Sequence, residues 1–163
     1  MILSILTWIV APEAIIKDTE AASSGLDGGP SNPIQRASIE LFEQKNIDLE
    51  MTALRSEFSK KQNLAIKILE EVGINCSIDS NRAFYIWGDI SQLPFPINRS
   101  DTFFQEALKR KVIVVPGYLF DIRPNLKISE PKFKNFIRFS FGPEEKNLKM
   151  GLAKIVELIQ SFQ

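Results

Sequence analysis

The chain has 163 residues, of which 44% are hydrophobic and 25% are charged, a composition typical of a globular domain with an apolar core. Lys and Arg number 20, as do Asp and Glu, so the formal net charge is zero and supports neither a nucleic-acid partner nor an acidic tail for a basic partner. The absence of histidine excludes histidine-based triads, Cys/His zinc sites and imidazole acid–base catalysis.

The only cysteine, Cys76, excludes an intrachain disulfide and suits a reducing compartment, so we expect a cytoplasmic protein. Cys76 alternates with the apolar residues Ile74 and Ile78, which predicts that its thiol is buried. The apolar start, residues 1–10, is too short to span a bilayer and carries no positive charge of the kind that opens a signal peptide. We therefore predict a buried strand at 5–10 and no membrane partner, with a secretory signal as the alternative.

Helical patterns dominate the first half of the chain. Pro and Glu favour the first turn of a helix, and they predict one over residues 13–24. The Gly- and Pro-rich residues 25–33 predict a loop, which a second helix follows. Apolar residues recur at helical spacing from 47 to 72, and Gly73 is typical of a helix C-terminal cap.

Strands and helices alternate after Gly73, which predicts a small sheet covered by helices. The apolar run 112–115 has no polar residue, as is typical of a strand that is covered on both faces. In chain order, we predict strands at 74–78 and 83–90, a helix at 101–111, a strand at 112–115, an extended loop at 121–134, a strand at 136–141 and a helix from 143 onward.

The strand at 136–141 carries the strongest candidate for a binding residue. Strict alternation places Ile137, Phe139 and Phe141 on a face toward the core and Arg138 on the other face. A guanidinium is a planar fork of donors that fits a carboxylate in a bidentate pair. The alternative is an arginine on the solvated face of a half-buried sheet.

The order of these elements, with particular stretches inside them, resembles the C-terminal part of the class I/II aminotransferases. These are pyridoxal-phosphate enzymes of the aspartate aminotransferase fold. The matching stretches are Trp8-Ile-Val-Ala-Pro-Glu, Leu26-Asp-Gly-Gly-Pro-Ser-Asn-Pro, Phe84-Tyr-Ile-Trp-Gly-Asp, Val112-Ile-Val-Val-Pro-Gly-Tyr and Phe136-Ile-Arg-Phe-Ser-Phe-Gly-Pro.

The resemblance implies an α/β (α+β) fold, made of helices and a small mixed sheet. It also implies three parts: residues 1–45 as a remnant of the large cofactor-binding domain, 46–73 as a long connecting helix, and 74–163 as a small C-terminal domain. Each expectation comes from the family and none from composition.

The resemblance further implies that Arg138 binds the substrate's carboxylate. The loop that carries Gly29, Ser31 and Asn32 resembles one that reaches the neighbouring subunit's site in the family's homodimer, although an ordinary surface loop is the alternative. Three aromatic residues are further candidates to line the pocket, with core or surface positions as the alternative: Tyr85, Trp87 and Tyr118.

In this family a lysine upstream of the matching segment forms the Schiff base with pyridoxal 5'-phosphate. An arginine and a glycine usually precede the family's tryptophan, but here Ile5 and Thr7 occupy those positions before Trp8, so the phosphate-binding arginine is missing. Lysines such as Lys17 and Lys60 have the polar spacing of solvated helix faces. We therefore expect no catalytic residue, no cofactor-binding residue and no metal site in this chain.

Several functions remain open at this stage. The first is a fragment of an aminotransferase of amino acid metabolism and biosynthesis, which transfers an amino group between an amino acid and a 2-oxo acid and is inactive without the missing lysine. The second is a non-catalytic α+β interaction or carboxylate-binding module, and the third is an inert gene remnant. In each case the first helices would lack a covering sheet, so we expect marginal stability, self-association or a need for a partner.

Overall fold

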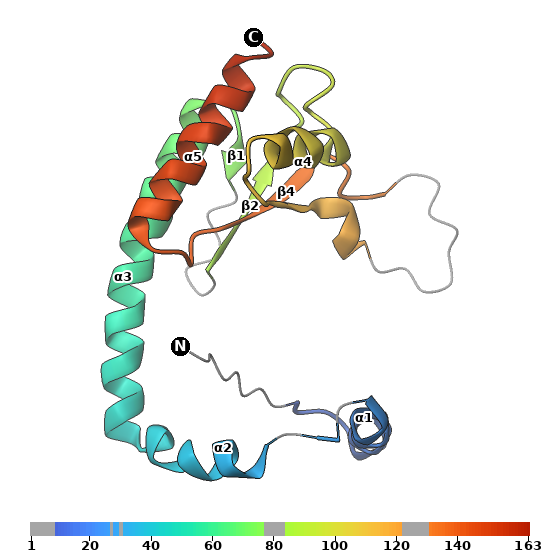
Figure 1. Cartoon of the computed structure of the whole chain (residues 1–163), viewed down its shortest axis with the longest axis vertical. Coiled ribbons are helices and arrows are strands. Elements are labelled where there is room, and N and C mark those ends of the chain that lie inside the picture. The colour runs from blue at the N-terminus through green and yellow to red at the C-terminus, as the bar shows by residue number, and fades with distance from the viewer. Residues whose placement is uncertain (1–8, 27, 30, 77–83, 122–130) are drawn as a thin grey trace. The chain divides into compact units, whose positions relative to one another are not determined.

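The computed structural model describes residues 9–26, 28–29, 31–76, 84–121 and 131–163. The chain divides into two compact units, residues 1–53 and 54–163. The elements, drawn in Figure 1, are α1 (Glu13–Leu26), α2 (Asn32–Ala37), the 3-10 helix η1 (Ile39–Phe42), α3 (Gln44–Glu71), β1 (Asn75–Cys76), β2 (Tyr85–Asp89), α4 (Ser100–Lys109), β3 (Val115–Pro116), the 3-10 helix η2 (Gly117–Phe120), β4 (Phe136–Ser140) and α5 (Glu145–Gln160).

The first unit contains α1, α2, η1 and the start of α3. Both predicted helices are present. The predicted buried strand at 5–10 lies mostly outside the described residues, and its described part, Ile9 and Val10, is exposed and in no strand. None of the described residues up to position 53 is buried. Among the described helices of the whole chain, none combines the length and the apolar character that a bilayer crossing requires.

The second unit is built on a four-stranded sheet in the order β1-β2-β4-β3. Every neighbouring pair is antiparallel, so the sheet is not mixed as the resemblance implied. The reason lies in the connections: β2 and β3, which α4 separates in sequence, run the same way, and β4 lies between them in the opposite direction. The predicted α/β (α+β) class, helices on a small sheet, is otherwise confirmed.

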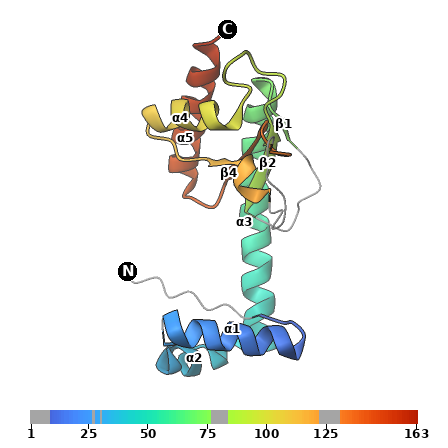
Figure 2. The same ribbon diagram turned by 90° about the vertical axis from the view of Figure 1, so that its right-hand side faces the viewer.

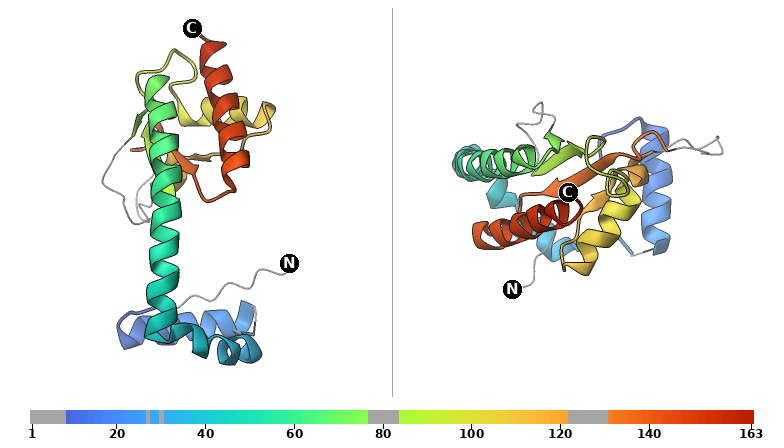
Figure 3. Two further views of the ribbon diagram at one scale, coloured as in Figure 1. Left: turned by 90° about the vertical axis from the view of Figure 1, so that its left-hand side faces the viewer. Right: turned by 90° about the horizontal axis from the view of Figure 1, so that it is seen from above.

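One face of this sheet forms the core of the second unit, with α4, α5 and the C-terminal part of α3 packed around it (Figures 2 and 3). Ile137, Phe139 and Phe141 are 0%, 6% and 1% exposed, as the alternation predicted. The ring of Phe103 on α4 meets that of Phe139 edge-on, with 6.2 Å between centroids. Cys76 is buried in the same cluster, which confirms its prediction.

The long helix α3 ends as its sequence predicted. Gly73 has a φ of 88°, a conformation that glycine adopts without strain. The N–H of Gly73 donates to the carbonyl of Glu70, and that of Ile74 donates to the carbonyl of Leu69. These two bonds form a Schellman motif, which turns the chain directly from the helix into β1.

Two predictions about local structure were wrong. The run 112–115 is not a strand covered on both faces, because only Val115 enters β3 and Ile113 is 80% exposed. Pro143 lies before α5, which has Glu144 as its N-cap residue, and so it is not in the first helical turn. Part of the predicted loop at 121–134 falls outside the described residues.

Candidate carboxylate-binding site

Arg138 lies at the centre of β4, on the face of the sheet opposite the core. It is directly opposite Trp87 of β2 on one side and Val115 of β3 on the other. Since β4 alternates between buried and half-buried residues, the core neighbours Ile137 and Phe139 fix the direction in which Arg138 points. The arginine is therefore mounted on a central strand with a defined register.

Aromatic rings surround the guanidinium of Arg138. Its central carbon lies 4.1 Å from the centroid of the Tyr85 ring and 4.7 Å from that of Phe120. Tyr85 belongs to β2, which neighbours β4, and Phe120 belongs to η2, which directly follows β3, the strand on the other side of β4. Contacts of this kind are favourable because the face of an aromatic ring carries partial negative charge.

Trp87 connects these rings to a larger cluster. Its ring meets Phe120 edge-on at 5.4 Å and Phe133 edge-on at 5.5 Å, and it stacks on Phe136 at 5.6 Å. Trp87 therefore supports one of the two rings that contact the guanidinium. The structure places Tyr85 and Trp87 on the face of Arg138, whereas Tyr118 is 38% exposed and has no ring contact among the described residues.

Among the described residues, no side chain neutralises the charge of the Arg138 guanidinium. Nε of Arg138 is buried without a hydrogen-bond partner, and no ion pair within the described part of the chain includes Arg138. The carboxylate of Asp89, on the same face, instead accepts a hydrogen bond of 2.8 Å from the N–H of Ser91. The guanidinium is therefore available to pair with the carboxylate of a ligand.

The other predicted site residues belong to the first unit. Gly29 has a φ of 85°, and Ser31 is the N-cap residue of α2 without a side-chain capping bond. The side-chain oxygen of Asn32 accepts a 3.0 Å hydrogen bond from Nε of Arg36. These contacts position the start of α2, and they belong to a different unit from Arg138.

The lysines of the described ranges lie on exposed or half-buried positions, with one exception. Lys61 is the one buried lysine in the described ranges, an exception to the prediction of solvated lysines. Its ammonium donates a 3.0 Å hydrogen bond to the carbonyl of Pro143 and lies 3.7 Å from the carboxylate of Glu57. That ammonium is already held between α3 and the start of α5. In the part of the chain that the structure describes, no three or more Cys, Asp or Glu side chains lie together as a metal site would require.

Sequence reasoning proposed Arg138, Tyr85 and Trp87 as candidates and did not propose Phe120. The alternation of Tyr85 and Trp87 on one strand was a usable signal for those two. Phe120 reaches Arg138 from 18 positions earlier in the sequence, through a 3-10 helix with no periodic pattern. No local signal marks such a contact.

The chain is similar in sequence to aminotransferases and to a transcriptional regulator. Residues 6–155 match the family model described as aminotransferase class I and II. The aspartate aminotransferase of Sulfurisphaera tokodaii is 26% identical over 157 residues, which cover 94% of this chain and 36% of that protein. An uncharacterized HTH-type transcriptional regulator of Bacillus subtilis, YisV, is 30% identical over 116 residues, which cover 70% of this chain and 23% of the regulator.

Solved structures give the same fold. The aromatic aminotransferase from Pyrococcus horikoshii OT3 superposes with a TM-score of 0.69 and 22% identity, over 93% of this chain and 37% of that one. An aminotransferase from Mycobacterium tuberculosis gives a TM-score of 0.67 at 19% identity, over 93% and 36% of the two chains. The chain thus spans little more than a third of the length of these proteins.

Proposed function

Since this chain belongs to the aminotransferase class I and II family, we propose that it is the part of a pyridoxal-phosphate-dependent aminotransferase in which Arg138 binds the substrate's carboxylate. The parent enzyme would transfer an amino group between an amino acid and a 2-oxo acid. The observation that carries the proposal is the guanidinium of Arg138, which contacts two aromatic rings and has no anionic partner among the residues that the structure describes. A planar cation held in this way is suited to pair with a carboxylate.

Titration with 2-oxoglutarate tests this proposal directly. Trp87 lies opposite Arg138, so its fluorescence reports on binding at this face, and the Trp8→Phe background removes the other tryptophan. We expect a saturable change with a Kd on the order of millimolar. The change should disappear in Arg138→Ala and weaken in Arg138→Lys, because lysine has no planar fork.

Two controls complete this titration. Sodium chloride at matched ionic strength should produce no saturable change, and Arg99→Ala, which removes an exposed arginine on the loop before α4, should bind as the parent chain does. Equal binding by the parent chain and by Arg138→Ala would refute the proposed role of Arg138.

We also propose that the chain alone does not catalyse transamination. Covalent attachment of pyridoxal phosphate needs a free lysine in a site that holds the cofactor, and the buried ammonium of Lys61 is already engaged by Pro143 and Glu57. After incubation with pyridoxal phosphate and borohydride, peptide mapping should find low, scattered labelling of lysines. Stoichiometric labelling of one lysine would overturn this proposal.

Membership of the family also suggests which domain of the parent enzyme each segment of this chain represents. We propose that residues 1–45 derive from the large domain, 46–73 from the connecting helix and 74–163 from the small domain, and that Gly29, Ser31 and Asn32 approach the partner subunit of a homodimer. Cross-linking of Ser31→Cys with a bismaleimide, which adds one thiol at each end, tests the last point, because buried Cys76 gives little background. A covalent dimer is expected with Ser31→Cys, and an equal yield with Ser56→Cys on α3 would contradict it.

A second candidate function comes from the similarity to YisV. Because a regulator of the HTH type shares 30% identity with this chain, we propose as the alternative that the fold serves as a non-catalytic carboxylate-binding module of a larger protein. Both functions use Arg138 in the same way. The two functions give different results when the chain is joined to the remaining, N-terminal part of an aminotransferase, which is inactive by itself. Amino transfer by the joined protein supports the first function, and carboxylate binding without transfer supports the second.

A further inference from the structure

The contacts of Arg138 indicate how its guanidinium is held. An arginine side chain has several rotatable bonds, and their freedom must be lost before the fork can bind a planar group. Here the rings of Tyr85 and Phe120 lie 4.1 and 4.7 Å from the guanidinium carbon. No hydrogen bond or ion pair among the described residues shares this task. The two rings are the contacts that restrict the side chain.

The burial of one nitrogen restricts the direction of binding. Nε of Arg138 is buried and has no hydrogen-bond partner, so an incoming oxygen cannot reach it without rearrangement. The two terminal nitrogens are not among the buried atoms that lack a partner. A carboxylate would therefore approach the end of the guanidinium and not the edge that contains Nε.

We infer that Tyr85 and Phe120 form an aromatic clamp that positions Arg138 to bind a carboxylate end-on through its two terminal nitrogens. This inference rests on the proposed function for the identity of the ligand, but the clamp itself is a property of the free chain. Tyr85 and Phe120 are positioning residues, since they act through Arg138 and donate no hydrogen bond to the ligand.

The clamp depends on the fold around it. Phe120 follows the tight turn at Gly117, where a Cβ would lie 2.5 Å from the carbonyl oxygen of Phe133 and 2.6 Å from that of Phe136. Only glycine allows this close approach, so the start of η2 is fixed against β4. Trp87 then packs edge-on against Phe120 at 5.4 Å. These contacts give the ring of Phe120 a defined position over Arg138.

Nuclear magnetic resonance of the free chain tests the clamp without any ligand. A buried Nε–H beside two rings should give a proton signal that is shifted by ring currents and exchanges slowly with water, and Arg138→Lys identifies it by its loss. We expect Tyr85→Leu and Phe120→Leu each to move this signal toward that of a solvated arginine and to speed its exchange. Tyr85→Phe, which keeps the ring, should preserve the signal, as should Phe104→Leu on α4, which alters a ring in the core.

Binding of 2-oxoglutarate then separates the clamp from the proposed function. The double variant Tyr85→Leu/Phe120→Leu should lose about tenfold in affinity, while Tyr85→Phe stays near the parent value. If Arg138→Ala abolishes binding but the double variant binds normally, the clamp is refuted and the proposed function stands. If the Nε–H signal responds as expected but no variant affects binding, the clamp stands and the carboxylate role fails.

The Nη signals of Arg138 test the end-on geometry. Saturating 2-oxoglutarate should shift the Nη–H resonances and leave the Nε–H resonance nearly unchanged. A large downfield shift of Nε–H would show that the carboxylate binds the other edge and would overturn this part of the inference. Circular dichroism of each variant confirms that the fold is retained before these comparisons are made.

Discussion

Cys76 is the residue whose chemistry is most changed by the fold. It is the last residue of β1, and its side chain is part of the core cluster and is 3% exposed. Burial, together with the nearby charge of Glu70, raises the pKa of the Cys76 thiol to about 12. The thiolate is the reactive form of cysteine, so in the folded chain the thiol of Cys76 is neither accessible nor ionised at neutral pH.

This raised pKa predicts how Cys76 responds to alkylation. At pH 8 we expect iodoacetamide to modify the unfolded chain rapidly and the folded chain only at the rate at which the second unit opens. Mass spectrometry of samples taken with time, with and without urea, measures both rates. Equal rates in the two conditions would contradict the buried position.

The same pKa gives a pH dependence of stability with a defined sign. In the unfolded chain the thiol ionises near the usual value of 9.0, whereas in the folded chain it stays protonated to about pH 12. Its contribution is therefore complete below pH 9 and is lost as the pH rises from there toward 12. Cys76→Ala should unfold more readily at pH 7, but its stability should decline less between pH 9 and 11.

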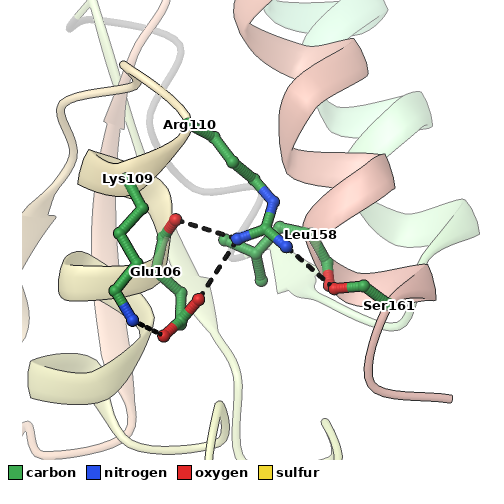
Figure 4. A network of polar contacts seen from close by, with 5 residues as sticks. All are labelled: Glu106, Lys109, Arg110, Leu158 and Ser161. Carbon is green, nitrogen blue, oxygen red and sulfur yellow. Dashed lines mark hydrogen bonds and ion pairs between the residues drawn. The ribbon is translucent and has the colours of Figure 1, made fainter.

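At the scale of elements, a polar network joins the C-terminal ends of α4 and α5 (Figure 4). Nη1 of Arg110 donates to the backbone carbonyl of Glu106 at 3.1 Å and to its carboxylate at 3.2 Å, and Nη2 donates to the hydroxyl of Ser161 at 3.0 Å. The hydroxyl of Ser161 donates in turn to the carbonyl of Leu158 at 2.6 Å. One arginine thus satisfies groups on two helices that are far apart in sequence.

Replacing this arginine should loosen the two helix ends. We expect Arg110→Met to lower the free energy of unfolding by about 1–2 kcal/mol at pH 7, as measured by urea denaturation. The hydrogen bond from Lys109 and, against the effect of burial, the one from Arg110 hold the pKa of Glu106 below its usual value of 4.5. A lowered pKa contributes stability above the unfolded value, and that stability is lost as the pH falls through the folded value.

The deficit of Arg110→Met should accordingly shrink below pH 4. Arg99→Met is the matched control, because the one ion pair of Arg99 among the described residues is with the exposed Asp101, two positions along the chain, at 3.4 Å. Its loss should cost less than about 0.5 kcal/mol. A deficit that stays constant down to pH 3 would show that Glu106 takes no part in the energetic coupling.

The surroundings of two glycines predict opposite effects on stability when each is replaced by alanine. Gly117 begins η2 against the carbonyls of Phe133 and Phe136, whereas Gly151 in α5 has no atom within 4 Å of an added Cβ. Gly117→Ala should destabilise the second unit by about 1–3 kcal/mol through overpacking. Gly151→Ala should stabilise it by about 0.5–1 kcal/mol, since alanine favours the helix. Thermal melting checks both signs, and stabilisation by Gly117→Ala would contradict the close approach.

The helices and strands differ in how well the sequence alone predicted them. Periodicity was sufficient for α3, α5 and β4, because the apolar positions of α5, β4 and the C-terminal part of α3 face the core. It failed at residues 112–115, where Lys111 adopts a φ of 62° and the N–H of Val112 bonds back to Ala107. The chain therefore leaves α4 in a direction that keeps Ile113 out of the sheet, and an apolar run alone does not reveal this. Phe120 was missed for a similar reason, since tertiary contacts alone bring it to Arg138.

At the scale of the whole molecule, the two units differ in how they are stabilised. Among the described residues, every buried hydrophobic side chain lies between Ala65 and Ile159, which belong to the second unit. The first unit exposes large apolar side chains instead: Ile9, Val10, Ile15, Leu26, Ile34, Ile39, Leu41, Phe42, Leu49 and Met51. Helices in water are stabilised mainly by packing of an apolar face, and none of the described residues of this unit is buried.

This asymmetry predicts behaviour that depends on protein concentration. Burial of the exposed side chains between copies would release apolar surface from water, and association stabilises the folded state by mass action. We expect the melting temperature and the sedimentation coefficient to rise with concentration, and hydrogen exchange to be fast in residues 9–53 at low concentration and slower at high concentration. The variant Leu41→Ser/Phe42→Ser removes two exposed apolar groups and should weaken each dependence, whereas Leu108→Ser, an exposed leucine of the second unit, should not. A sharp, concentration-independent transition of a monomer, with protected amides in both units, would mean that residues 1–53 are stabilised within a single chain.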